Sequence, residues 1–257
     1  MNASWRWSWQ KLVLSLGLSS IVGAVQAQAT FSWGPQVGLH STTATYHQND
    51  APLYYDTSIT SLTRFEAGLL TTIGYGHFLV QPALLYSQKG FVLNGTLLPT
   101  PFPSSRSVTA QLTSELNYLT LPLNFVYAQK ATGEGFHVFG GGYVGLLVSG
   151  KRKVHDEYIG NSTFASFYDS ELPIKPGSNS ESTTDFYAKR LDAGLQAGVG
   201  YQYQAALVQV TYSLGLSNPN VPHAGQAPTQ TPSYYNRSLA ISLTCLLHPT
   251  PTEATKR

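Results

Sequence analysis

The residues from Leu79 to Phe91, LVQPALLYSQKGF, alternate between two kinds of side chain. The even positions from Phe78 to Tyr86 are apolar or aromatic, whereas Gln81 and Lys89 stand among the odd positions. A repeat of two residues is typical of a β-strand with two different faces. The chain must therefore cover one face with a protein core or with lipid, and must satisfy the polar groups on the other.

The same alternation recurs in seven other segments. It is clearest in residues 191–203, LDAGLQAGVGYQY, where odd positions carry Leu, Ala, Val or Tyr and even positions carry Asp, Gly or Gln. In residues 136–151 the glycines at 140–142 permit a bulge, so the pattern does not assign the faces of that strand. The predicted strands cover residues 31–46, 61–75, 77–91, 114–128, 136–151, 187–203, 205–217 and 235–247.

Connections of two lengths separate these strands. Tight ones lie near Gly76, 133–135 and Gln204, and long ones cover 47–60, 92–113, 152–186 and 218–234. Strands of about ten residues can cross a bilayer at a tilt of about 45°, and short turns at one end with long loops at the other are typical of outer-membrane barrels. The sequence therefore predicts an all-β fold: an eight-stranded antiparallel up-and-down transmembrane β-barrel with long extracellular loops and short periplasmic turns.

A soluble, lipocalin-like barrel is the main structural alternative, because it has the same strand number but points its apolar face inward. Charged residues make up only 11% of the chain, against roughly 25% in an ordinary soluble domain. The second face is rich in Gly, Gln, Ser and Thr, which would coat a soluble barrel poorly. Aromatic residues also gather near the strand ends, as membrane interfaces require. These features favour the cell outer membrane, with its lipid as the partner of the apolar face.

Residues 1–29 are predicted to be a cleaved signal peptide, because Arg6 and Lys11 precede an apolar run that ends before the small residues Ala27 and Ala29. The barrel domain then covers 30–247, and a polar tail covers 248–257. Of the 15 basic residues two lie in the leader, which leaves 13 to balance 13 acidic residues. That balance argues against a nucleic-acid partner. Cys245 is the sole cysteine, so no internal disulfide can form.

These segments resemble the PorT-like outer-membrane β-barrel family of Gram-negative bacteria. The matching stretches are QPALLYSQKG (81–90), LNYLTLPLNFVY (116–127), GGYVGLLVSGK (141–151), DAGLQAGVGYQY (192–203) and VTYSLGLSN (210–218). The resemblance implies an integral outer-membrane barrel that the barrel-insertion machinery places in the membrane, and a few relatives are linked to protein secretion. Such barrels usually end on an aromatic residue, whereas the last predicted strand here ends at Leu247.

Charged residues on the inward faces are expected to meet in the outer half of the lumen. Unpaired ions there would cost several kcal/mol each, so we expect a charge network that closes the barrel. Its predicted members are Arg64, Glu66, Lys89, Arg190 and Asp192. The lower lumen is expected to hold the uncharged side chains of Gln81, Asn124, Gln196, Gln202 and Gln209.

No pattern of residues indicates catalysis, a cofactor or a metal. The seven histidines lack a spacing such as HExxH and are interpreted as solvated residues of turns and loops. His40 and Ser87 fall in neighbouring regions, yet no motif joins them to an acid. The glycine-rich run 133–145 is followed by another strand, whereas a phosphate-binding loop needs a helix. We therefore predict that the protein is not an enzyme.

The connection 152–186 is the richest exposed feature. It begins directly after Lys151 and contains further charged residues. Aromatic residues beside charges on a long loop suit the recognition of an envelope protein. A loop that packs over its own barrel mouth would show the same composition. The candidate partner-binding residues are Tyr158, Phe164, Phe167 and Tyr168.

Three classes of function remain open at this point. The first is a barrel with a side-chain-filled lumen that acts through its surface loops and assists an envelope or secretion assembly. The second is a narrow channel or small-ligand-binding barrel, which is disfavoured because eight strands enclose an interior that side chains can fill. The third is an outer-membrane enzyme, which the lack of a catalytic motif disfavours.

Overall fold

The computed structural model describes residues 30–47, 55–97, 107–159, 165–178, 186–221 and 233–247. The predicted signal peptide and polar tail lie outside these residues. Within them, no helix has the length and apolar character that a membrane span would need. The strands are β1 (Thr30–His47), β2 (Tyr55–Tyr75), β3 (Phe78–Leu97), β4 (Ser107–Ala128), β5 (Gly135–Ile159), β6 (Ala165–Pro176), β7 (Phe186–Ala188), β8 (Leu191–Tyr203), β9 (Ala206–Gly215) and β10 (Ser233–Cys245).

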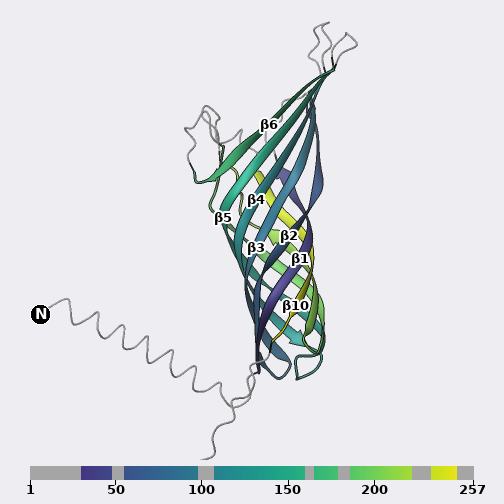
Figure 1. The fold of residues 1–257 in the computed structure, drawn as a ribbon, viewed down its shortest axis with the longest axis vertical. Coiled ribbons are helices and arrows are strands. Elements are labelled where there is room, and N and C mark those ends of the chain that lie inside the picture. Colours follow the sequence, from purple (N-terminus) through teal and green to yellow (C-terminus); the bar gives the residue numbers. More distant parts are fainter. Residues whose placement is uncertain are drawn as a thin grey trace, which may run out of the picture.

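Eight of these strands close into an antiparallel ring (Figure 1). Neighbours along the chain pair from β1 to β5, then β5 pairs with β8, and β8, β9 and β10 follow in order. Pairing between β1 and β10, from Gln36↔Thr244 to His47↔Ser233, closes the ring. The predicted eight-stranded antiparallel barrel is therefore confirmed.

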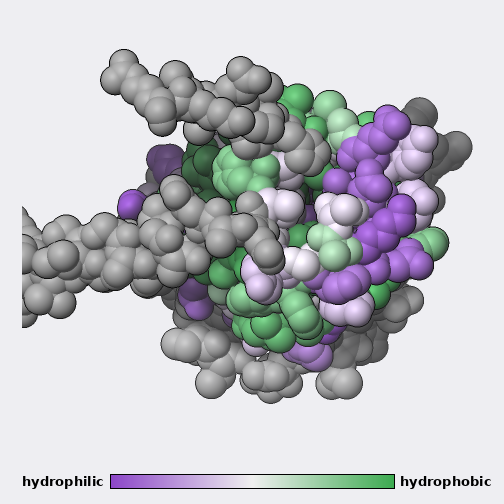
Figure 2. All heavy atoms as spheres, turned by 90° about the horizontal axis from the view of Figure 1, so that it is seen from below, coloured by the Kyte–Doolittle hydropathy of each residue, from purple (hydrophilic) through white to green (hydrophobic). Residues whose placement is uncertain are grey.

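The outward face of the ring carries a continuous belt of exposed apolar side chains, which we call the apolar band. Phe78 and Leu84 are exposed while Gln81 and Lys89 are buried, as the alternation in β3 predicts. In β5, Val138 and Val144 point outward and Tyr143 points inward. The structure thus assigns the two faces of this strand, which the sequence pattern left open. Seen from below, hydrophobic residues cover much of the described surface and hydrophilic ones gather along one side (Figure 2). The band covers 31–39, 65–75, 78–86, 119–127, 136–148, 191–203, 208–216 and 239–247.

Aromatic residues border the band at both ends. At the end with tight turns, Trp33, Tyr75 and Phe78 are exposed, and at the other end Phe65 and Tyr86 pack with ring centroids 6.1 Å apart. The tight turns contain Gly76 and Gln204, whose φ angles are 58° and 51°. Gly76 adopts such an angle at no steric cost because glycine has no Cβ atom. Both ends of the ring-forming chain, at Thr30 and Cys245, lie at this turn end.

Four barrel strands, β2 to β5, continue beyond the apolar band at the opposite end, where β6 joins them to form what we call the distal sheet (Figure 1). The sheet consists of residues 55–61, 91–97, 107–117, 149–159 and 165–176. The long connection predicted at 152–186 is therefore wrong for most of its length. β5 runs on to Ile159 and forms a hairpin with β6, and the three-residue β7 pairs parallel with the end of β6.

A change of partner along β5 makes this extension possible. Residues 135–146 of β5 pair with β8, whereas residues 150–159 pair with β6. The register between β4 and β5 shifts at the same place, since Asn117 faces Ser149 and Tyr118 faces Leu147, which leaves Val148 as an extra residue. A bulge of this kind increases the local twist of a strand. It lies near Val148, beyond the glycines at 140–142 where the sequence permitted one.

Candidate functional site

Amide side chains cross the lower lumen from several strands. Gln209 of β9 donates through Nε2 to Gln81 Oε1 of β3 at 3.1 Å, and Gln81 Nε2 donates to Thr72 Oγ1 of β2 at 3.2 Å. Gln196 Nε2 of β8 donates to Asn124 Oδ1 of β4 at 2.7 Å. Hydrogen bonds within a buried lumen satisfy groups that would otherwise remain unpaired. These uncharged residues lie where the sequence predicts them.

A buried ion pair lies above the amides. Lys89 Nζ of β3 is 2.8 Å from Asp192 Oδ2 of β8, and the side chains are 8% and 0% exposed. The ammonium also lies over two aromatic rings, 4.0 Å from the Tyr143 centroid and 5.4 Å from the Tyr118 centroid. A cation over aromatic faces is attracted by their quadrupoles. The two charges thus balance each other across the lumen. The Tyr118 and Tyr143 rings cover the Lys89 ammonium.

Asp192 accepts further hydrogen bonds from two other strands and the segment after β9. Ser217 Oγ donates to Asp192 Oδ1 at 2.6 Å, Asn236 Nδ2 donates to Oδ2 at 3.2 Å, and Tyr143 OH donates to Oδ2 at 3.4 Å. Buried ion pairs are tolerated when their remaining lone pairs are satisfied in this way. Asp192 therefore joins β3, β5 and β10 at one level of the lumen.

Glu66 lies in the same interior but does not contact the Lys89–Asp192 pair directly. Its Oε1 accepts from Gln36 Nε2 at 3.5 Å, and its Oε2 is 3.9 Å from His40 Nδ1. His40 is almost fully buried, so the interpretation of the histidines as solvated residues is wrong for it. His137 is buried as well, with its Nε2 2.5 Å from the Gly133 carbonyl at a tight turn.

The other two predicted members of the charge network lie elsewhere. Arg64 pairs with Glu115 of β4 at 2.8 Å, because the register between β2 and β3 shifts between Ser61 and Glu66 and the face alternation does not carry through. Arg190 is exposed. It precedes β8, which begins at Leu191 rather than at residue 187, so strand alternation does not apply to it. The lumen network is therefore smaller than predicted.

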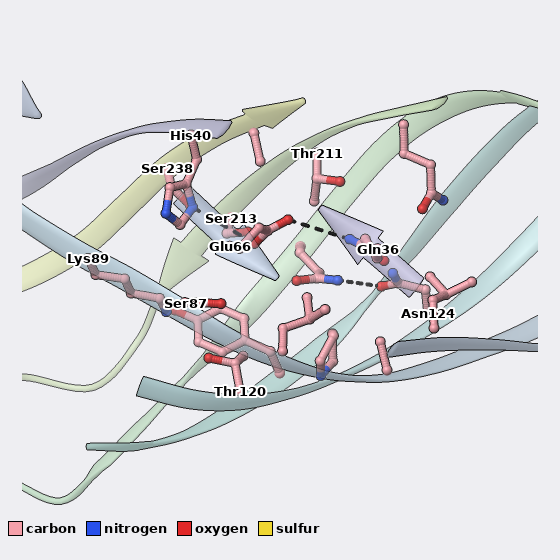
Figure 3. A pocket seen from close by; sticks show the side chains of 18 residues that line it. Gln36, His40, Glu66, Ser87, Lys89, Thr120, Asn124, Thr211, Ser213 and Ser238 are labelled. Atoms are coloured by element: carbon pink, nitrogen blue, oxygen red, sulfur yellow. Dashed lines mark hydrogen bonds and ion pairs between the residues drawn. The ribbon is translucent and has the colours of Figure 1, made fainter. Parts of the chain in front are cut away.

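A cavity of about 50 Å³ remains between the amides and the ion pair. Figure 3 shows Gln36, Glu66 and Asn124 directed toward it from β1, β2 and β4. Space of this size accommodates about three water molecules. His40 and Ser87 both line the cavity, yet it is too small for the substrate of a serine hydrolase.

Two buried aromatic residues of β5 lie over glycines of β8 inside the lumen. A Cβ atom on Gly194 would come within 2.6 Å of Tyr143 Cε1, and one on Gly198 within 2.5 Å of Phe139 Cζ. Large side chains opposite glycines allow close packing at a curved sheet. The sequence pattern placed these glycines inward but did not reveal their partners, because the facing of β5 was open.

The outward face of the distal sheet carries a charge cluster. Glu115 of β4 lies 2.8 Å from Arg64, 3.7 Å from Lys151 and 3.4 Å from Lys153. Lys151 Nζ is also 3.5 Å from Glu171 Oε1 of β6. These pairs are partly exposed, so water screens them. The cluster stands directly beyond the apolar band.

A shallow groove of about 460 Å³ follows the outward face where β4, β5 and β6 lie side by side. His155 Nδ1 of β5 is 2.5 Å from Asp169 Oδ1 of β6 across this groove. The hydrogen bond to Asp169 raises the pKa of His155, and the charges of Asp169, Glu157 and Asp156 act in the same direction. The groove is lined by Gln111, Thr113, Lys153, Val154, His155, Asp169, Ser170 and Glu171.

A half-buried arginine lies on the inner face of the distal sheet. The Arg152 guanidinium lies 4.4 Å from the centroid of Phe186 of β7, and burial lowers its pKa. Nearby Tyr234 packs against Phe91 with centroids 5.1 Å apart, and burial raises the pKa of Tyr234 to about 12. The prediction of an exposed loop from residue 152 onward is wrong for Arg152, because this residue belongs to β5.

The predicted partner-binding aromatics are divided among different surroundings. Tyr168 of β6 is exposed. Tyr158 belongs to β5 and Phe167 to β6, so both are strand residues rather than loop residues. Phe164 lies outside the described residues. Within the described part of the chain, no three His, Cys, Asp or Glu side chains gather so that they could hold a metal ion.

Comparison with solved structures gives matches of low sequence identity. Ail, the attachment invasion locus protein of Yersinia pestis, solved in complex with the heparin analogue sucrose octasulfate, is 8% identical over 85% of this chain and 99% of that chain, with a TM-score of 0.39. Neisserial surface protein A is 10% identical over 84% of this chain and 97% of that chain (TM-score 0.32). OprG from Pseudomonas aeruginosa is 11% identical over 86% and 97% (TM-score 0.33).

Comparison with curated protein sequences gives no match. A sequence model of one family does match, and it covers residues 26–219. This region includes every strand from β1 to β9, while β10 completes the ring through its pairing with β1 and β9. The closed ring and the apolar band place the protein in the outer membrane. The chain belongs to the outer membrane protein beta-barrel domain family.

Proposed function

We propose that this barrel is a closed membrane anchor that presents the distal sheet to the cell exterior for recognition of an envelope or extracellular partner. The observation that carries the proposal is the Lys89–Asp192 pair, which spans the lumen together with Tyr118 and Tyr143. The space left beside it is only about 50 Å³. These contacts and this small volume support a lumen that is closed to solutes larger than water.

The distal sheet supports the second half of the proposal. Its outward face displays polar residues of β4 and charged residues of β5 and β6 along a groove of about 460 Å³. Of these strands, β4 and β5 are continuous with those of the barrel. A binding surface on continuous strands is held more rigidly than one on a loop. In outer-membrane barrels the short turns and the termini face the periplasm, which directs the distal sheet outward.

Finer assignments follow from the sequence. We infer that the chain is a PorT-like member of its family, that residues 1–29 are removed on export, and that the insertion machinery accepts a last strand ending near Leu247. A role in an envelope or secretion assembly is consistent with a closed barrel whose exposed part is a sheet. The mass of the protein purified from its own outer membrane gives the cleavage site directly.

The closed lumen is tested by recordings in planar lipid bilayers. The folded protein, identified by a gel band that shifts on boiling, is expected to give no large steady conductance. The double variant Lys89→Ala/Asp192→Ala, if it still shows the heat-shifted band, is expected to give small ion leaks. A stable, porin-like conductance in the unmutated protein would contradict the proposal and favour the narrow-channel alternative.

Recognition by the distal sheet is tested with a photo-cross-linking amino acid at Tyr168, an exposed residue of β6. A matched control carries the same group at Tyr201, an exposed residue of the apolar band. In native membranes we expect protein adducts at position 168 and only lipid adducts at position 201. Equal protein adducts at both positions would mean that the distal sheet is not the recognition surface.

A further inference from the structure

The strand β6 has one paired side and one side that is largely open. Ala165–Ile174 of β6 pair with β5. On the other side, among the described residues, only β7 pairs with β6, and it reaches no further than Ile174–Pro176. The backbone of residues 165–173 therefore forms an edge of the distal sheet. Edge strands present N–H and C=O groups that another strand can use.

Pro173 shows which backbone groups point toward the open edge. In an antiparallel ladder, directly opposed residues alternate between hydrogen-bonded and non-hydrogen-bonded pairs. Pro173 faces Lys151 of β5 and has no N–H to donate, so this pair is a non-hydrogen-bonded one. By alternation Asp169 and Glu171 are also in non-hydrogen-bonded pairs with β5. Their N–H and C=O groups consequently point away from β5, into the open edge.

The side chains along this edge divide by charge. Asp169 and Glu171 lie on the outward face and are 77% and 56% exposed. The other face carries Tyr168, which is exposed, and Leu172, which is half-buried. A strand added at this edge would therefore meet two carboxylates two residues apart on one face and an aromatic and an aliphatic side chain on the other.

We propose that the edge of β6 binds an extended, basic polypeptide segment by strand addition. Such a segment has Lys or Arg at two positions separated by one apolar residue. Each basic side chain lies beside Asp169 or Glu171, while the apolar residue packs near Tyr168 and Leu172. Main-chain hydrogen bonds supply affinity and the alternate side chains supply specificity, as in other cases of strand addition. This inference rests on the proposed function, because it requires the distal sheet to be accessible from outside.

A second copy of the chain is a poorer occupant of the edge. Among the described residues, the other side of the distal sheet that lacks a neighbouring strand is residues 55–61 of β2, since the β1–β2 ladder ends at Thr42↔Leu62. Its sequence, YDTSITS, contains an acidic residue and no basic one. Like charges placed opposite one another destabilise a strand pair. Charge complementarity thus favours a basic partner from another protein.

Charged residues and proline on an edge strand can also serve only to prevent aggregation. The two roles differ in what they predict for a basic peptide. If the charges and the proline only prevent aggregation, the peptide does not bind. If charge attraction alone binds the peptide, methylation of its backbone N–H groups does not change the affinity. Strand addition predicts dependence on both charge and particular backbone N–H groups.

The experiment uses the folded full-length protein in detergent and a fluorescently labelled, end-capped heptapeptide of alternating lysine and valine. Because the residues opposite Asp169 and Glu171 form hydrogen-bonded pairs, lysine N–H groups face β6 and valine N–H groups face solvent. We expect N-methylation of the lysines to weaken binding at least tenfold and N-methylation of the valines to change it less than threefold. A peptide with glutamate in place of lysine should not bind.

Variants of the protein complete the test. Asp169→Asn/Glu171→Gln should weaken binding of the lysine–valine peptide at least tenfold, while Glu134→Gln, at an exposed tight turn, should leave it unchanged. Equal binding of the two N-methylated peptides, or no binding of the parent peptide, would overturn strand addition. A sealed lumen in bilayer recordings would still stand in either case, so failure here is distinguishable from failure of the proposed closed barrel.

Discussion

The apolar band and the distal sheet are built from the same strands, yet they face different solvents. In β4 the outward residues from Leu119 to Tyr127 are apolar, whereas Gln111 and Glu115 stand on the same face of the same strand further along. Backbone pairing with β5 runs through both regions, from Ser107↔Ile159 to Ala128↔His137, and its register shifts by one residue between Asn117 and Tyr118. The hydrogen-bonded ladder therefore does not mark the end of the membrane. The outward side chains do, because lipid accepts only apolar groups.

Ion pairs sharpen this comparison, and the buried one should have the largest effect. Asp192→Ala leaves the Lys89 ammonium buried without a counter-charge, which costs about 3–5 kcal/mol. Glu115→Ala removes a partly exposed carboxylate of the distal sheet and should cost about 1 kcal/mol or less. The free energy of unfolding in urea, measured with the protein in lipid vesicles, checks both values. A double variant Lys89→Met/Asp192→Leu should recover much of the loss, and equal losses for the two single variants would contradict the buried-pair account.

A charge placed on the outward face tests where the membrane ends. Leu123→Arg, in the middle of the apolar band, should cost about 2–4 kcal/mol because the guanidinium enters hydrocarbon. Gln111→Arg, on the same face of β4 in the distal sheet, should change stability by about 0.5 kcal/mol or less. Unfolding in vesicles gives both numbers. If Gln111→Arg were as costly as Leu123→Arg, the distal sheet would lie within lipid.

The inward face of the band should tolerate added volume less well than its outward face. Gly198→Ala places a Cβ atom 2.2 Å from the Val210 carbonyl oxygen and 2.5 Å from Phe139 Cζ, so it should cost about 1–3 kcal/mol through overpacking. At Gly140 the nearest atom to an added Cβ is the Gln196 carbonyl oxygen at 3.8 Å. Gly140→Ala should accordingly change stability by about 0.5 kcal/mol or less. The gel-shift temperatures of the two variants compare them directly, and a similar drop for both would argue against the packed lumen.

Strand alternation predicts the barrel because the apolar positions mark the face of each strand that lies away from water along its whole length. It succeeds for Gln81 and Lys89, whose strand is regular from one end of the band to the other. It fails for Arg64, which falls at a register shift, and for Arg190, which precedes its strand. Bulges and strand ends depend on tertiary pairing, so a single sequence does not locate them.

Strand alternation does not predict the distal sheet, for a related reason. Beyond the apolar band both faces of β5 carry polar residues, since Arg152 and Asp156 alternate with Lys153 and His155. A polar segment with no apolar period is typical of a loop. Its strands are nonetheless held by the ladders that continue from the barrel. The lumen partners Ser217 and Asn236 were missed because nothing in their local sequence indicates that they meet Asp192.

The smallest expected effect concerns His155 and sharpens the contrast between buried and exposed pairs. Its hydrogen bond to Asp169, together with the charges of Glu157 and Asp156, raises its pKa above the ordinary value of 6.5. A raised pKa in the folded state means that protonated His155 stabilises the β5–β6 pairing fully below about pH 6.5, and that this contribution is lost as pH rises through the folded-state pKa. The ring is solvent-exposed, so the change should remain local to β6. An NMR titration of the His155 ring should give a pKa above 6.5, Asp169→Asn should lower it, and Glu157→Gln should lower it less. A His155 pKa at or below 6.5 that does not change in Asp169→Asn would contradict the pairing of these two side chains across the groove.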